Sequence, residues 1–179
     1  LISKEDQKNL TETLASFNKV LIVAGQQDYN SGLAKGIEKF SKANKAALTG
    51  DIISNFHSLK GNIRYSDVFL ASCGESIQQS LQPDLLITFG KSVISKNLKL
   101  FLRKHQPRQH WHIQPAGPAA DTFQSISQII HCNPKTFFES LSAPPAIGKF
   151  ELQKKANYAQ LWLAEEHRMA RAYQTHFNA

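Results

Sequence analysis

The chain has 179 residues, of which 41% are hydrophobic and 20% are charged. This composition is typical of one globular domain with a full hydrophobic core, and it excludes a disordered chain. No apolar run approaches the length that crosses a bilayer, so we expect no membrane insertion. The net charge of +7 comes from Lys and Arg residues that are scattered along the sequence. Without a basic stripe or a reading motif, nucleic-acid binding is not indicated.

The two cysteines give no sign of a metal site or a disulfide framework. Cys73 and Cys132 lie far apart and lack the C-x-x-C spacing of a zinc site. Buried reduced thiols are the expected alternative, and we expect a cytoplasmic location, where disulfides are rare. The chain begins at Leu1 rather than methionine, which suggests a segment of a longer protein.

The first part of the chain predicts a strand between two helices. Residues 5–15 have a helical pattern, and residues 19–25 form a continuous apolar and β-branched run that ends at glycine. Such a run is typical of a parallel strand buried on both faces. A second helix is expected over residues 29–43, with Asn30 or Ser31 as its N-cap.

The middle of the chain continues this alternation. Residues 46–50 predict a weaker strand, and a polar loop over residues 51–62 follows it. Two short helices are expected over residues 65–72 and 75–82, and a proline ends the second of them. The apolar run of residues 84–90 then predicts a strong strand.

The last part of the chain adds two strands and three helices. An amphipathic helix is expected after Ser95 and a strand over residues 110–114. The isoleucines near residue 130 predict a last strand, and Asn133 caps a helix whose first turn contains a proline. A segment rich in proline and glycine follows, and then one long helical pattern.

Alternating strands and helices predict an α/β fold of the doubly wound, Rossmann-like kind. We expect a mostly parallel sheet of about five or six strands with helices on both faces, plus a C-terminal helical extension. The expected units are a domain over residues 1–142, a linker over 143–150 and a helix over 151–179. That helix carries Trp162 and other large apolar residues, and we expect little of the domain to be left to cover them.

Two phosphate-binding motifs can be tested directly. The triplet Gly90-Lys91-Ser92 follows a predicted strand, but a P-loop also needs glycine five positions earlier, where Leu85 stands. The dinucleotide fingerprint G-x-G-x-x-G is likewise missing after the first strand, where Gly25-Gln26-Gln27 stands. Neither an NTPase nor tight binding of NAD or FAD is favoured.

Other polar residues have ordinary structural explanations. His110 and His112 have the spacing of a metal pair on one strand face, but no third ligand supports them, and packing or surface roles are expected. Asp51 and Asp121 follow predicted strands, and turn or N-cap roles are favoured over ligand contacts. The cluster Glu165–Arg168 is expected to be a solvated helix face.

No catalytic triad or nucleophile elbow can be assembled from this sequence. The loop after Gly90 is the best candidate for a ligand site, because ligands of open α/β sheets bind beyond the carboxyl ends of the strands. Ser92, Ser95 and Lys96 combine hydroxyls, a helix N-terminus and a cation, which suit a carboxylate or a phosphate. Helix capping explains the serines equally well.

Several stretches resemble one enzyme family over most of the chain. The run "VLIVAG", the pattern D-x-x-S-N at Asp51 to Asn55, "PDLLITFG-x-x-x-x-SK" at Pro83 to Lys96 and "IHCN" at Ile130 to Asn133 carry the resemblance. Together they resemble the central domain of the 2-succinyl-5-enolpyruvyl-6-hydroxy-3-cyclohexene-1-carboxylate synthase (MenD) family.

The resemblance implies a transferase of menaquinone biosynthesis that depends on thiamine diphosphate and Mg²⁺. It would decarboxylate 2-oxoglutarate and add the succinyl semialdehyde unit to isochorismate. The implied partners are the pyrimidine- and pyrophosphate-binding domains of the same polypeptide, in a homo-oligomer, with the helix from Glu151 leading into the latter domain. The catalytic glutamate and the Gly-Asp-Gly metal motif belong to those other domains. The segment alone is therefore expected to be inactive and to bind neither cofactor nor metal.

One candidate site residue comes from the resemblance. Lys96 matches a lysine that holds the carboxylates of isochorismate or its adduct, and Ser95 beside it is expected to contact substrate as well. Asn97 stands where some relatives have an arginine, so the resemblance supplies no second cation. The alternative interpretation is a stand-alone Rossmann-type nucleotide- or anion-binding module.

Overall fold

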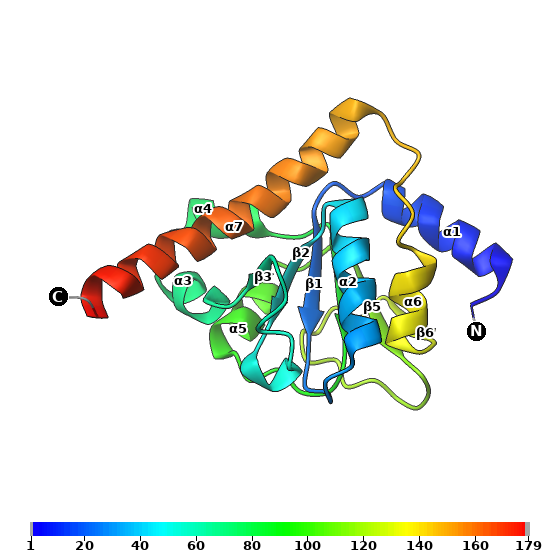
Figure 1. The fold of residues 1–179 in the computed structure, drawn as a ribbon, viewed down its shortest axis with the longest axis horizontal. Helices are drawn as coiled ribbons and strands as arrows, with labels where there is room; N and C mark the ends of the chain where they lie inside the picture. The colour runs from blue at the N-terminus through cyan, green and yellow to red at the C-terminus, as the bar shows by residue number, and fades with distance from the viewer. Residues whose placement is uncertain (1, 178–179) are drawn as a thin grey trace.

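The computed structural model describes residues 2–177 and contains one six-stranded, all-parallel sheet (Figure 1). The strand order is β3-β2-β1-β4-β5-β6. The strands are β1 (Val20–Ala24), β2 (Ala47–Gly50), β3 (Asn62–Ile63), β4 (Leu85–Phe89), β5 (Gln109–Gln114) and β6 (Gln128–His131). The predicted doubly wound α/β fold is therefore confirmed.

Helices cover both faces of the sheet, each with its own hydrophobic cluster. The helices are α1 (Lys4–Ala15), α2 (Ser31–Asn44), α3 (Ser66–Ser72), α4 (Glu75–Leu81), α5 (Lys96–Lys104), α6 (Pro134–Ser140) and α7 (Lys149–Phe177), with a short 3-10 turn at Ile52–Ser54. One cluster joins α1, α2 and α6 to the sheet, and the other joins α3, α5 and α7 to it. Every residue of β1 and β4 is buried, as expected of strands between two helical layers.

Strand β3 was missed in the sequence. Its two residues lie at the edge of the sheet, where Asn62 pairs with Leu48 and Ile63 pairs with Thr49. The segment was predicted as a polar loop, because a two-residue strand has no apolar run or alternation that a pattern could reveal. The other predicted helices and strands are confirmed, with ends that differ by a few residues.

Helix α7 crosses the sheet as part of the second layer (Figure 1). Tyr158 and Trp162 are fully buried, and the Trp162 ring meets the edges of Phe69 and Phe101 at centroid distances of 5.7 and 5.9 Å. The expectation that little of the domain covers this helix is wrong for Trp162. The helices α3 and α4 are only seven residues long, and α7 covers part of the sheet face that these short helices do not reach.

Two buried charges hold α7 in place. The Lys155 ammonium donates hydrogen bonds to the carbonyls of Leu14 and Phe17 at the end of α1, and burial lowers its pKa to about 8. Glu166 is 3% exposed and accepts hydrogen bonds from the backbone N–H groups of Arg64 and Tyr65 at 2.9 and 2.8 Å. The solvated face predicted for the cluster around Glu166 is therefore wrong for this residue. A helix pattern shows which residues are charged but not which of them meets a neighbouring loop.

The loops that follow β1 and β4 are hydrogen-bonded to each other. Gly25 N–H donates to Phe89 O, Gln26 N–H to Ser92 O, and Lys91 N–H to Gln26 O, each at 2.8 Å. The strand order reverses between these two strands, where Rossmann folds usually bind a dinucleotide pyrophosphate. Here three backbone hydrogen bonds join the two loops, and a pocket of about 500 Å³ lined by Gln26, Gly90 and Lys91 lies beside them.

Close approach of the two loops requires glycine at Gly25. A Cβ atom there would lie 2.3 Å from the carbonyl oxygen of Lys91 and 3.1 Å from that of Phe89. We expect Gly25→Ala to lower the free energy of unfolding of the chain by about 1 to 3 kcal/mol, because backbone atoms must move to admit the methyl group. Urea denaturation measures this change.

Gly36→Ala in α2 is the matched control. A Cβ atom there would make ordinary contacts at 3.5 Å, and alanine favours a helix interior by roughly 0.5 to 1 kcal/mol. Stability should be unchanged or raised by up to about 1 kcal/mol. Equal losses in the two variants would show that the crossing does not require glycine at residue 25.

The buried carboxylate of α7 gives a second prediction. Glu166→Gln removes the charge that the Arg64 and Tyr65 donors meet, and it should lower the free energy of unfolding by about 1.5 to 3 kcal/mol. Glu12→Gln is the control, because Glu12 is an exposed glutamate that pairs with Lys8 on the surface of α1, and its effect should stay within about 0.5 kcal/mol. Similar denaturation midpoints for Glu166→Gln and the unchanged chain would contradict an anchoring role.

Candidate functional site

The candidate site lies where α5 begins, beyond the carboxyl end of β4. Ser95 is the N-cap of α5, and its Oγ accepts the N–H of Leu98 at 3.1 Å. The predicted helix start after Ser95 is confirmed. The same hydroxyl donates to Oδ1 of Asp67 at 2.6 Å, and Ser95 is only 7% exposed.

Asp67, in the first turn of α3, binds both neighbours of Lys96. Its Oδ1 also accepts the backbone N–H of Asn97 at 2.8 Å, and the Asn97 side-chain amide donates to its carbonyl and carboxylate at 3.0 and 3.2 Å. Burial alone would raise the pKa of Asp67, but the hydrogen bonds from Ser95 and Asn97 outweigh it and lower the pKa below its usual value. The group therefore stays ionised at neutral pH.

Sequence reasoning missed Asp67. An acidic residue in the first turn of a short helix is common, and nothing in the pattern shows that α3 packs beside the start of α5. The side chain of Asn97 is turned toward Asp67, so this position presents neither a cation nor an amide to a ligand.

Asp51 holds the residues just before α5. Its Oδ2 accepts the backbone N–H groups of Ile94 at 2.5 Å and Ser95 at 3.1 Å. Asp51 stands at the N-cap position of the turn Ile52–Ser54 but makes no capping bond there, so the predicted local role is corrected. Asp121 does have the expected turn role, since it accepts the N–H groups of residues 125 and 126.

The Lys96 side chain is exposed and makes no hydrogen bond or ion pair with the part of the chain that the structure describes. Exposed apolar side chains flank the carboxylates that hold its helix: Ile52 (69% exposed), Val68 (49%) and Ile94 (58%). An unpaired cation among exposed apolar residues suits contact with a further body or ligand.

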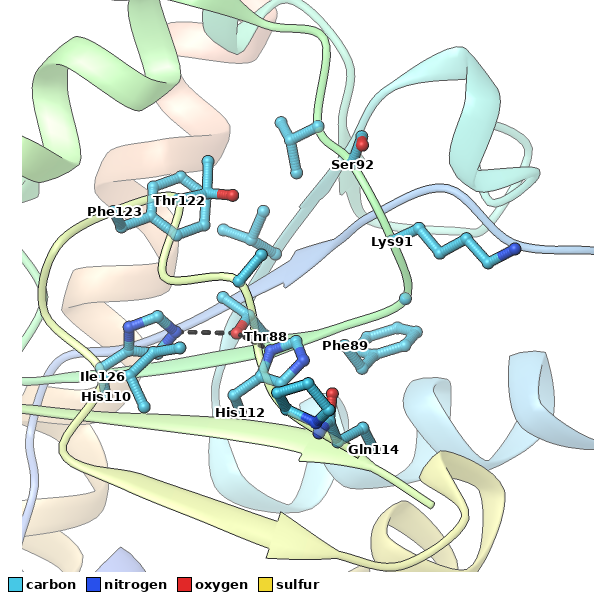
Figure 2. A pocket seen from close by; sticks show the side chains of 15 residues that line it. Thr88, Phe89, Lys91, Ser92, His110, His112, Gln114, Thr122, Phe123 and Ile126 are labelled. Atoms are coloured by element: carbon cyan, nitrogen blue, oxygen red, sulfur yellow. Dashed lines mark hydrogen bonds between the residues drawn. The ribbon is translucent and has the colours of Figure 1, made fainter. Parts of the chain in front are cut away.

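A separate pocket of about 270 Å³ lies between the ends of β4 and β5 (Figure 2). On its floor, Thr88 Oγ1 lies 2.7 Å from His110 Nε2 and 2.8 Å from His112 Nδ1. Burial lowers the pKa of His110 to about 4 and also lowers that of His112, so both rings are neutral at pH 7. The predicted packing role of His110 is confirmed by its 1% exposure.

The structure does not bring the sequence candidates together in this pocket. Lys91 and Ser92 line its rim, whereas Lys96 does not line it. The Lys91 side chain points away from the histidines (Figure 2). In the triplet that resembles a P-loop, the Lys91 N–H and the Ser92 carbonyl are hydrogen-bonded to Gln26, so this N–H is not available to a phosphate.

Within residues 2–177, no group of three or more His, Cys, Asp and Glu side chains could hold a metal ion, and no helix could span a membrane. Cys73 and Cys132 are free thiols, the latter buried as expected and the former half-buried.

Sequence comparison connects the chain to characterised relatives. Three proteins named 2-succinyl-5-enolpyruvyl-6-hydroxy-3-cyclohexene-1-carboxylate synthase are similar to it. The protein of Cytophaga hutchinsonii is 32% identical over 92% of this chain and 28% of its own length. Those of Flavobacterium johnsoniae and Porphyromonas gingivalis are 33% and 35% identical, over 71% and 69% of this chain and 23% and 21% of their own lengths. The chain thus spans about a quarter of the length of these relatives.

A family model described as "Middle domain of thiamine pyrophosphate" matches residues 4–179. The match includes the whole sheet, the start of α5 and all of α7. The doubly wound sheet and the sequence relatives agree with it. This chain belongs to the family of middle domains of thiamine pyrophosphate enzymes.

Proposed function

We propose that this chain is the middle domain of a transferase that decarboxylates 2-oxoglutarate and adds the succinyl semialdehyde unit to isochorismate. The observation that carries this proposal is the family match over residues 4–179, together with relatives named for the corresponding synthase. Thiamine diphosphate and Mg²⁺ supply the decarboxylation chemistry and are held by other domains. The chain itself is inactive, and its residues bind and orient substrate.

Lys96 is the proposed substrate contact. Its ammonium group is free for a carboxylate of isochorismate or the adduct, and the helix that carries it is held by Asp51 and Asp67. Ser95 was predicted to contact substrate too. Because its hydroxyl is buried and donated to Asp67, the geometry favours a role in placing Lys96.

The proposed partners are the pyrimidine- and pyrophosphate-binding domains of the same polypeptide, in a cytoplasmic homo-oligomer. The exposed apolar side chains of Ile52 and Ile94 support a further domain that covers the carboxyl ends of the strands. Residues 143–150 are the proposed linker, and residues 151–179 the lead-in to the next domain. The buried half of α7 packs into the core of the middle domain.

The alternative of a stand-alone nucleotide-binding module has less support, because the glycine fingerprint that dinucleotide-binding modules carry is missing after β1. Calorimetric titration of the chain with FAD, NAD and ADP separates the two functions. The proposed function predicts no clear binding of any of the three, and micromolar binding of one would favour the alternative.

The proposed contact can be tested in the full-length enzyme. Lys96→Ala should lower kcat/KM for isochorismate about ten- to a hundredfold, because a charge-assisted contact to a carboxylate is worth roughly 1.5 to 3 kcal/mol. Thiamine diphosphate affinity and KM for 2-oxoglutarate should stay within about twofold, since the lysine meets neither group in this proposal. Steady-state kinetics measures all three.

Lys60→Ala is the matched control, because Lys60 is an exposed lysine before the amino end of β3, whereas Lys96 lies beyond the carboxyl end of β4. It removes the same charge and should leave the isochorismate constants within about twofold. Unchanged isochorismate constants in Lys96→Ala would rule out the substrate contact.

A further inference from the structure

We propose that Asp67 is a positioning residue that sets the direction in which Lys96 presents its ammonium group. The inference rests on the proposed function of Lys96 as a substrate contact. It assigns to Asp67 no contact with substrate, cofactor or reacting atoms, and its effect on the reaction passes through Lys96.

The first observation is the pattern of hydrogen bonds along residues 94–97. Asp51 holds Ile94 and Ser95, and Asp67 holds Ser95 and Asn97. Within the described chain, Lys96 is the one residue of these four whose side chain and backbone N–H have no bond to either carboxylate. Both of its neighbours are held, so the backbone from which its side chain leaves has little freedom.

The second observation is the origin of the two carboxylates. Asp51 follows β2, whereas Asp67 belongs to α3, and neither lies in the segment that carries Lys96. The loop before α5 is held by the bonds of Lys91 and Ser92 to Gln26 and by the buried Val93 side chain, and the two carboxylates extend this hold to residues 94–97. The bond from Asn97 back to the Asp67 carbonyl makes the contact between α3 and α5 reciprocal.

The third observation concerns charge. Asp67 lies beside the N-terminal turn of α5, where backbone N–H groups and the helix dipole favour an anion. Its oxygens are occupied by Ser95 and Asn97, and within residues 2–177 it forms no ion pair with Lys96. Asp67 therefore orders the segment without neutralising the lysine that a substrate carboxylate needs.

A lysine whose backbone is ordered in advance loses less conformational freedom when it binds. Asp67→Asn keeps the size of the side chain but weakens the charge-assisted bonds to Ser95 and Asn97. In the full-length enzyme we expect KM for isochorismate to rise about tenfold. The kcat value and KM for 2-oxoglutarate should stay within about twofold.

A double-mutant cycle distinguishes positioning from general damage. When Lys96 is already alanine, Asp67→Asn should raise KM for isochorismate by less than about twofold, because the group it positions is gone. Full additivity of the two effects would overturn the inference. Asn44→Ala serves as the stability control, since it removes buried hydrogen bonds to the Phe40 and Leu141 carbonyls on the other face of the sheet and should leave KM for isochorismate unchanged.

A second variant keeps the test decisive if Asp67→Asn does not fold. Asn97→Ala removes two of the hydrogen bonds to Asp67 but leaves its carboxylate, and it should raise KM for isochorismate about threefold. If Lys96→Ala impairs isochorismate use while Asp67→Asn and Asn97→Ala do not, the positioning role is wrong and the proposed function stands. If Lys96→Ala has no effect, the substrate contact itself is wrong.

Discussion

The backbone crossing between Gly25 and Gly90 is the constraint on which the site depends. A parallel doubly wound sheet usually opens a crevice where its strand order reverses, and in this chain three backbone hydrogen bonds join the two neighbouring segments there. Gly90 has a φ of +81°, and a Cβ atom there would lie 2.8 Å from Gly25 O. Because glycine tolerates this φ and this close approach, the loop after β4 can pass the Gly25 loop on its way to α5.

Between this crossing and α5, the loop meets two carboxylates from other elements. Asp51 and Asp67 receive the N–H groups and the hydroxyl that a helix start leaves unsatisfied, and so they determine where α5 begins. Acids beyond the ends of β-strands often suggest catalysis or metal binding. Here their oxygens are occupied by the protein itself, and the exposed cation between them is the group left for a ligand.

Helix α7, in the same layer as α3 and α5, shows the same use of buried charge. Lys155 meets carbonyl groups at the end of α1, and Glu166 meets N–H groups before α3. Each charge meets polar backbone groups at the end of a neighbouring element, and these hydrogen bonds offset the cost of burial. The helix is therefore placed by polar contacts at two points and by Tyr158 and Trp162 between them.

The sequence by itself determined the α/β class, the parallel sheet, the helix start at Ser95 and the resemblance that points to Lys96. These follow from local signals, such as apolar runs, capping residues and short motifs, that neighbouring residues carry together. The tertiary structure decided what lies between elements: the edge strand β3, the burial of Glu166, and the role of Asp67. Those features depend on hydrogen bonds between residues up to about a hundred positions apart, as for Glu166 and Arg64, and no local pattern records such pairs.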